Sequence, residues 1–473
     1  MHILEKTNSI VQEKIKLLRE QVVGIDKKVP TTEGLKTYVN LDNGASTPTL
    51  KPVLDKVNEF LEWYSSIHRG SGFKSLISSE VYEKARTIVA EFVKADLEKN
   101  SVIFVKNSTE ALNKLAYRFP FKKDSVVLSS MMEHHSNDLP WRNKAKVIHI
   151  RITPEGRLDL NDLEEKLERY KGKIDLVTIT SASNVTGFIN PIHQIARMVH
   201  HIGAKLAVDA AQLAPHRQID LKPHNHPEHL DFLIFSAHKI YAPFGTGVLI
   251  GPNSLFEQGD PEFVGGGTVD AVTLDRVLWA DPPDKEEAGS PNVVGVVALA
   301  EAIKVLTELG MENIAIHEKG LCEYFLKRVP EIEGLTLYGD GSKECEDRLG
   351  VFAFNLKEMH YALVSAILSY EAGIGVRHGC FCAHPYVQAL LQVGKEETER
   401  FISQIKENYR AELPGAVRIS FGFYNSFEEI DYFIEWLKKI AKGKYKDEYI
   451  LDKTWGTYTP KDFNPDFERY FSL

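Results

Sequence analysis

The sequence predicts an α/β protein with a large domain built on a mostly parallel sheet of seven strands, followed by a smaller α+β domain. Short continuous apolar runs recur from about residue 100, helix-like stretches separate them, and the C-terminal third mixes strands with helices. Continuous apolar strands that alternate with helices are typical of a parallel sheet covered on both faces. The expected strands are 101–106, 125–130, 146–150, 175–180, 205–210, 231–236 and 247–251.

We divide the 473 residues into four segments. Residues 1–37 form a helical arm, because their first apolar residues fall near helical spacing. Residues 38–300 form the large domain, and residues 301–442 form the small domain, to which part of the N-terminal segment also contributes. Residues 443–473 are aromatic, contain proline and are weakly periodic, which predicts an extended C-terminal tail.

Composition excludes several classes of function. The net charge of −9 argues against a nucleic-acid partner and against a basic membrane-surface patch. No apolar run approaches the roughly 20 residues that span a bilayer, and the N-terminus lacks the apolar core of a signal peptide. Only four cysteines are present, too few for a disulfide framework in so long a chain, so we expect a cytoplasmic protein. Cys322 and Cys345 are expected to be structural.

Polar residues follow the predicted strands, where open α/β sheets bind their ligands. Asp209 and Lys239 each come after a strand, and Ser108 and Thr109 come where a helix begins. A lysine there can form a Schiff base, a buried carboxylate can hold a protonated pyridine nitrogen, and helix-start amides suit a phosphate. Each residue taken alone also fits a solvated lysine or an ordinary helix cap.

Ten motifs extend this pattern over most of the chain. They are LDNGASTP, HRGSG, NSTEALN, EHHSN, SNVTG, VDAAQ, SAHKIYAPFGTG, GGGT, EAGSPN and VRISFGFYNSFEEID. From about residue 38 to residue 440, the sequence resembles the fold-type I pyridoxal-phosphate enzymes of aminotransferase class V, and among them the SufS-like (group II) cysteine desulfurases. The resemblance implies that the large domain, 38–300, binds pyridoxal 5'-phosphate.

The resemblance implies a role for each residue around the cofactor ring. Lys239 forms the Schiff base and moves protons, and Asp209 keeps the pyridine nitrogen protonated. His134 stacks on the ring as a catalytic residue, and Gln212 hydrogen-bonds the phenolic oxygen. Asn184 is also placed among the cofactor residues.

The phosphate is expected to be bound by residues of two subunits. Ser108, Thr109, Ser236 and His238 contribute from one chain, and the resemblance adds Thr268 of the GGGT motif from a second chain. It therefore implies a homodimer with shared active sites.

Two arginines are candidates for binding an amino-acid substrate. The resemblance implies that Arg418 and Asn184 bind its carboxylate, for which an arginine fork is a natural partner. Arg377 is placed beside them and can favour a nearby thiolate. Arg418 lies in an apolar run, where a structural ion pair is the alternative interpretation.

The stretch RHGCFCAHP carries two cysteines, and the resemblance makes Cys382 a nucleophile that accepts sulfur as a persulfide while alanine is released. Cys380 stands where many relatives have a histidine. A second interpretation has Cys380 resolve a persulfide on Cys382. A third has both cysteines bind zinc with His378 and His384, but no further Cys/His cluster is evident, and we expect no metal site.

We therefore predict a cytoplasmic cysteine desulfurase, with a sulfur-acceptor protein as a possible partner and no nucleic acid or membrane partner. A C–S lyase or selenocysteine lyase acting by β-elimination is the alternative, and a class V aminotransferase or epimerase is another. A non-catalytic scaffold is disfavoured, because it has no use for Lys239, Asp209 and Arg418. The sequence does not identify the sulfur acceptor or the role of the tail.

Overall fold

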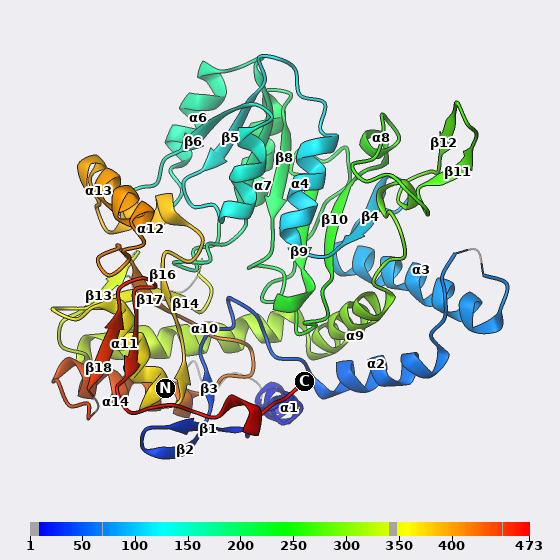
Figure 1. The fold of residues 1–473 in the computed structure, drawn as a ribbon. Helices are drawn as coiled ribbons and strands as arrows, with labels where there is room; N and C mark the ends of the chain where they lie inside the picture. The colour runs from blue at the N-terminus through cyan, green and yellow to red at the C-terminus, as the bar shows by residue number, and fades with distance from the viewer. Residues whose placement is uncertain (1–8, 69, 340–347, 447) are drawn as a thin grey trace. The chain divides into compact units, whose positions relative to one another are not determined.

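The computed structural model describes residues 9–68, 70–339, 348–446 and 448–473 (Figure 1). The chain forms two compact units, and three chain segments contribute to each. Unit 1 comprises Met1–Val23, Ala45–Ser183 and Phe188–His317, and unit 2 comprises Gly24–Gly44, Asn184–Gly187 and Glu318–Leu473.

A seven-stranded sheet forms the centre of unit 1, with strand order β4-β10-β9-β8-β7-β5-β6. β10 is antiparallel to both of its neighbours, whereas the other pairs are parallel. The predicted mostly parallel sheet is thus confirmed. Its strands are β4 (Asn100–Val105), β5 (Val126–Ser130), β6 (Lys146–Ile150), β7 (Ile174–Thr180), β8 (Lys205–Asp209), β9 (Phe232–Ser236) and β10 (Gly247–Pro252).

Helices pack on this sheet because most residues of its strands are apolar and buried. α4 (Ser108–Arg118) packs on β9 and β10, α7 (Ile192–His201) on β8, and α6 (Leu160–Arg169) on β6 (Figure 1). Leu112 and Leu115 of α4 are fully buried among residues of six strands. The other helices of unit 1 include α1 (Ser9–Arg19), α2 (Lys51–Trp63), α3 (Phe73–Val93), α5 (Leu139–Arg142), α8 (Asn253–Phe256) and α9 (Val293–Leu309).

Unit 2 is built on an antiparallel sheet of four strands in the order β13-β14-β17-β16. These are β13 (Leu335–Tyr338), β14 (Val351–Leu356), β17 (Ala416–Ser420) and β16 (Arg377–Gly379). Phe325, Phe352 and Phe433 lie in its buried core. A short parallel pair joins β3 (Val39–Asn40) to β15 (Ile374–Gly375), so residues early in the chain belong to this unit. Its helices include α11 (Tyr361–Tyr370), α12 (His384–Leu390), α13 (Lys395–Lys406) and α14 (Phe427–Ala441), and α10 (Met311–Arg328) spans the change from unit 1.

The two terminal segments differ from the expected helical arm and extended tail. In the described part of the arm, residues 9–37, α1 is the only helix, and β1 (Lys28–Thr31) pairs with β2 (Gly34–Thr37) as a hairpin. The C-terminal segment folds into a second hairpin, β18 (Tyr449–Asp452) and β19 (Thr457–Pro460), which packs on α11. Among the described residues, no helix is long and apolar enough to cross a membrane.

Candidate active site

The register of the sheet in unit 1 aligns the strand ends that carry the candidate residues. Thr180 lies opposite Asp209, and Gly247 lies between Ser236 and Val105. The loops that follow β4, β5, β8 and β9 therefore emerge at one edge of the sheet, as expected for a ligand site in such folds.

Ser108 and Ser236 lie together at the start of α4. Asn107 caps this helix by accepting from the Glu110 amide at 3.0 Å. The Ser108 amide donates to Ser236 Oγ at 2.8 Å, and the two hydroxyl oxygens are 2.7 Å apart. The start of this 11-residue helix carries partial positive charge, and the two serine hydroxyls lie beside it, so the pair fits a phosphate group.

Gly247 allows this close approach between strand and helix. A Cβ atom on Gly247 would lie 2.6 Å from Asn107 Cα and 2.9 Å from its amide nitrogen. Any larger residue at position 247 would displace the backbone that leads into Ser108.

His134 is oriented by the loop that follows β5. Its Nδ1 accepts from the Ser136 amide at 3.1 Å, so the neutral imidazole carries its proton on Nε2. Thr109 is joined to the same loop, since its hydroxyl lies 2.7 Å from Ser136 Oγ. Ser136 therefore connects the two predicted residues.

Glu133 anchors this loop, and its role was missed although it lies in the EHHSN motif. It accepts from the Thr180 amide at 2.8 Å, from Asn137 Nδ2 at 2.6 Å and from the Ser130 hydroxyl. Burial raises the pKa of Glu133 to about 8, and the charge of Asp209 acts in the same direction. The sequence feature that could have pointed to Glu133 is its place directly before the histidine pair of this motif.

The charges of Asp209 and Lys239 interact. Asp209 is buried, its Oδ1 accepts from the Ala211 amide at 3.0 Å, and Gln212 is buried in the same turn. Burial raises the pKa of Asp209, and the positive charge of Lys239 opposes that shift. A buried carboxylate can accept a hydrogen bond from the protonated pyridine nitrogen of pyridoxal phosphate. The lysine can form a Schiff base with the aldehyde of the same cofactor. Asp209 and Lys239 therefore fit this cofactor.

The turn that carries Lys239 is fixed by the LDNGASTP motif. The Thr47 amide donates to the His238 carbonyl at 2.9 Å, and Thr47 Oγ1 accepts from the Tyr241 amide at 2.8 Å. Burial and the charge of Lys239 lower the pKa of His238 to about 4. His238 is therefore neutral at physiological pH.

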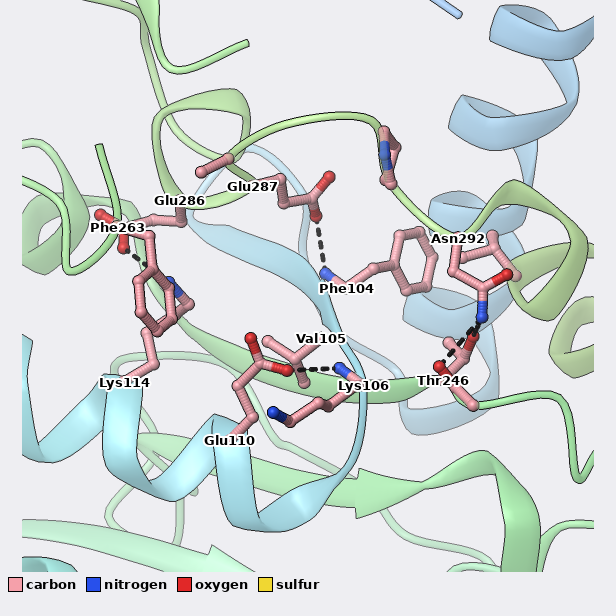
Figure 2. A pocket seen from close by; sticks show the side chains of 14 residues that line it. Phe104, Val105, Lys106, Glu110, Lys114, Thr246, Phe263, Glu286, Glu287 and Asn292 are labelled. Carbon is pink, nitrogen blue, oxygen red and sulfur yellow. Dashed lines mark hydrogen bonds and ion pairs between the residues drawn. The ribbon is translucent and has the colours of Figure 1, made fainter. Parts of the chain in front are cut away.

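Figure 2 shows a cavity of about 280 Å³ beside this turn. In its wall, Asn292 Nδ2 donates to the carbonyls of Phe244 and Gly245 at 2.6 and 3.0 Å, and Glu287 accepts from the Phe104 amide. The lining residues, all described, include none of the predicted site residues. The EAGSPN motif thus has a structural role in holding the loop after Lys239.

Thr268 is engaged within its own chain. Its side chain is fully buried, and its hydroxyl donates to the Gly265 carbonyl at 2.8 Å. This geometry gives no support to a phosphate contact in a second subunit, which stays a prediction.

In unit 2, Arg418 is buried on β17 and is held by Asp42. Its Nη2 donates to Asp42 Oδ1 at 2.8 Å, and its Nη1 donates to the Asn184 carbonyl at 3.0 Å. Burial lowers the pKa of Arg418, and Asp42 opposes this shift. Asp42 also accepts from Arg377 Nε at 3.0 Å. Asp42 was not predicted as a site residue, although it lies in the LDNGASTP motif.

The Nε of Arg418 remains available as a donor to a ligand. In the described part of the chain, its buried Nε has no hydrogen-bond partner. The ion pair with Asp42 matches the alternative interpretation of Arg418, while the free Nε fits a substrate carboxylate as well.

Cys382 is exposed on the loop between β16 and α12. Phe381 and Cys382 have φ angles of 54° and 55°, so two successive residues adopt the left-handed conformation. The Asn184 side chain donates to the Phe381 carbonyl at 2.7 Å, and the Arg418 guanidinium lies 5.1 Å from the Phe381 ring. Arg418 and Cys382 interact electrostatically.

Cys380 has a different environment. It is largely buried, its Sγ donates to the Pro414 carbonyl at 3.1 Å, and burial raises its pKa to about 12. It is therefore a thiol at neutral pH and a poor nucleophile. Among the described residues, no group of three or more His, Cys, Asp or Glu could hold a metal ion. Cys322 is buried, and Cys345 lies outside the described residues.

The parallel sheet, the buried aspartate after β8 and the lysine after β9 define a fold-type I pyridoxal-phosphate enzyme. A family model described as aminotransferase class-V matches residues 39–433. The chain belongs to this family, whose members depend on pyridoxal 5'-phosphate.

Relatives described as cysteine desulfurases match most of the chain. A cysteine desulfurase of Haloferax volcanii is 33% identical over 428 residues, which cover 88% of this chain and 93% of the relative. A probable cysteine desulfurase of Pyrococcus abyssi is also 33% identical, over 89% of this chain and 97% of the relative.

Solved structures agree with these relatives. The apo cysteine desulfurase of Thermococcus onnurineus NA1 matches with a TM-score of 0.73 and 32% identity, over 86% of this chain and 95% of that one. The Escherichia coli cysteine desulfurase CsdA, described as an S-sulfonic acid, matches with a TM-score of 0.74 and 25% identity, over 91% and 99%.

Proposed function

We propose that the protein is a cysteine desulfurase that transfers the sulfur of L-cysteine to Cys382. The observation that carries this proposal is an exposed cysteine on a loop in electrostatic contact with a buried arginine. Desulfurase relatives over most of the chain support the same reaction.

The reaction balances without a further reactant. The Cβ–S bond of L-cysteine breaks, an S–S bond forms between the released sulfur and Cys382 Sγ, and the proton of the Cys382 thiol is passed to the substrate carbon. The products are L-alanine and a Cys382 persulfide.

The residues of unit 1 prepare the substrate. Pyridoxal phosphate, when bound, supplies an electron sink for the substrate Cα. Lys239 Nζ takes the Cα proton and returns protons later, as a general base and acid. Asp209, held by the Ala211 amide, keeps the pyridine nitrogen protonated. His134 would lie against the cofactor ring, and its Nε2 carries the proton of the neutral imidazole because Nδ1 accepts from the Ser136 amide.

In unit 2, Arg418 is assigned to binding of the substrate carboxylate and Cys382 to attack on the substrate sulfur. Arg418 binds the substrate carboxylate through its free Nε, and Asn184 orients both Arg418 and the Phe381 carbonyl. Arg377, which shares Asp42 with Arg418, adds positive charge near the attacking thiolate.

We also propose a homodimer in the cytoplasm that passes sulfur to an acceptor protein. Segment 263–278 contains the hairpin of β11 (Val269–Val272) and β12 (Val277–Trp279), which Figure 1 shows. This segment is rich in exposed apolar side chains. Leu274 is fully exposed, and Val264, Val272 and Leu278 are each more than 60% exposed. Exposed apolar patches of this kind mark protein interfaces, which supports self-association.

Two variants and one control test the reaction. Lys239→Ala should abolish activity and the absorbance of the lysine-bound cofactor. Cys382→Ala should keep that absorbance and lose alanine formation, whereas Cys322→Ala should keep both. Mass spectrometry of the wild type with L-cysteine and no reductant should show one added sulfur on Cys382. Full turnover by Cys382→Ala would overturn the proposal in favour of β-elimination, in which Cys382 need not act.

A further inference from the structure

Residues 379–383, which we call the cysteine loop, are in contact with residues 409–415. The latter lie between α13 and β17. Cys380 Sγ donates to the Pro414 carbonyl at 3.1 Å. A Cβ atom on Gly415 would lie 2.9 Å from Gly379 Cα, so the two backbones touch where β16 ends. The position of Cys380 is thus set by the position of residues 409–415.

The C-terminal hairpin holds this segment through its turn. The Arg410 amide donates to the Lys453 carbonyl, and Arg410 Nη1 donates to the Thr454 carbonyl, both at 2.8 Å. Gly456 has a φ of +66°, and a Cβ atom there would lie 2.5 Å from the Arg410 carbonyl oxygen. Glycine is therefore required at position 456 for this contact.

A series of ring contacts connects the same hairpin to β16. Tyr458 of β19 lies 5.6 Å from the His360 ring, and His360 lies 4.3 Å from Tyr361. Tyr361 in turn lies 5.9 Å from His378 and donates to the Leu413 carbonyl at 2.9 Å. These contacts therefore connect the hairpin to β16, which precedes the cysteine loop, and to residues 409–415.

We propose that the C-terminal hairpin and Cys380 together position the cysteine loop. The hairpin fixes residues 409–415, and the Cys380 thiol ties the loop to Pro414, so Cys382 is presented in one backbone conformation. Because left-handed conformations at Phe381 and Cys382 are costly, contacts outside the loop must offset that cost. This inference rests on the proposed function, in which Cys382 is the nucleophile.

Cys380 acts here as a neutral donor and carries no sulfur. Its burial, which raises its pKa to about 12, keeps the proton on Sγ at all physiological pH values. Arg410, Tyr458 and Cys380 are then positioning residues, and the hairpin lies beyond residue 433, where the family match ends.

Replacement of Cys380 separates positioning from sulfur chemistry. Cys380→Ser keeps a hydrogen-bond donor, so kcat with L-cysteine should stay within about two-fold of the wild type. Cys380→Ala removes the donor and should lower kcat about five- to ten-fold with little change in KM. An equal loss in both variants would contradict the proposal and make Cys380 a sulfur-bearing residue, and a fully active Ala variant would contradict it too.

The hairpin is tested by hydrogen exchange on the cofactor-loaded enzyme. Arg410→Ala and Tyr458→Ala should speed amide exchange across residues 379–383 and lower kcat. Lys461→Ala is the matched control, since it removes only an exposed ion pair with Glu448 on the same hairpin. Unchanged exchange and unchanged kcat in both test variants would overturn the proposal.

The two proposals fail in different ways. If Cys382→Ala retains alanine formation, the proposed function fails, whatever the exchange data show. If Cys382 is essential but residues 379–383 exchange normally in Arg410→Ala and Tyr458→Ala, only the positioning role fails.

Discussion

Glu133 lies in the loop after β5, and burial keeps its carboxyl group protonated at neutral pH. It binds the amide of Thr180 and the side chain of Asn137, and it shares its environment with Asp209. Because burial penalises the charged form, its pKa rises to about 8 from an ordinary value of 4.5. The loop of His134 therefore depends on a neutral carboxyl group.

This pKa predicts a stability that falls with pH. A group whose pKa is raised in the folded state stabilises fully below its unfolded value, near 4.5, and loses that contribution as pH rises through about 8. Denaturant unfolding of the wild type and Glu133→Gln between pH 5 and pH 9 should show the wild type losing stability relative to the variant up to pH 8. A difference that is independent of pH would contradict this.

A second prediction concerns the Arg418 side chain. Arg418→Lys keeps the charge but loses the fork geometry, in which Nη1 and Nη2 are already used and Nε is free. We expect KM for L-cysteine to rise about ten-fold or more, as for the loss of a charge-assisted contact. Steady-state kinetics measure this, and an unchanged KM would show that the carboxylate binds elsewhere.

At the scale of elements, close contact between β10 and the start of α4 shapes the proposed phosphate site. Gly247→Ala should weaken pyridoxal-phosphate retention, because the added methyl group overlaps the Asn107 backbone. Overpacking of this kind costs about 1–3 kcal/mol. Gly394→Ala is the control, since a Cβ atom there meets nothing within 4 Å. Dialysis followed by absorbance measurement compares the two, and equal retention would contradict the account.

The sequence predicts the elements that local pattern determines. The seven strands were found because each is a continuous apolar run, and α4 because polar caps precede its apolar face. The C-terminal hairpin was taken for an extended tail, because its strands are short and depend on packing against α11. Asp42 and Pro414 were missed because their partners, Arg418 and Cys380, lie 376 and 34 residues away in sequence.

At the scale of the whole molecule, the exposed segment 263–278 predicts self-association. Leu274→Asp places a charge in the apolar hairpin and should convert a dimer into a monomer at micromolar concentrations. Leu35→Asp, at an exposed apolar residue outside this segment, is the control. Light scattering after size-exclusion chromatography measures both, and a Leu274→Asp protein that stays dimeric would place the interface elsewhere.

The most direct test of the proposed reaction is product analysis of the purified enzyme with L-cysteine and a thiol reductant. We predict equal amounts of alanine and sulfide, because the sulfur leaves as a Cys382 persulfide that the reductant then releases. Pyruvate and ammonia accompanied by sulfide would contradict the account, since they would show β-elimination in which Cys382 takes no part.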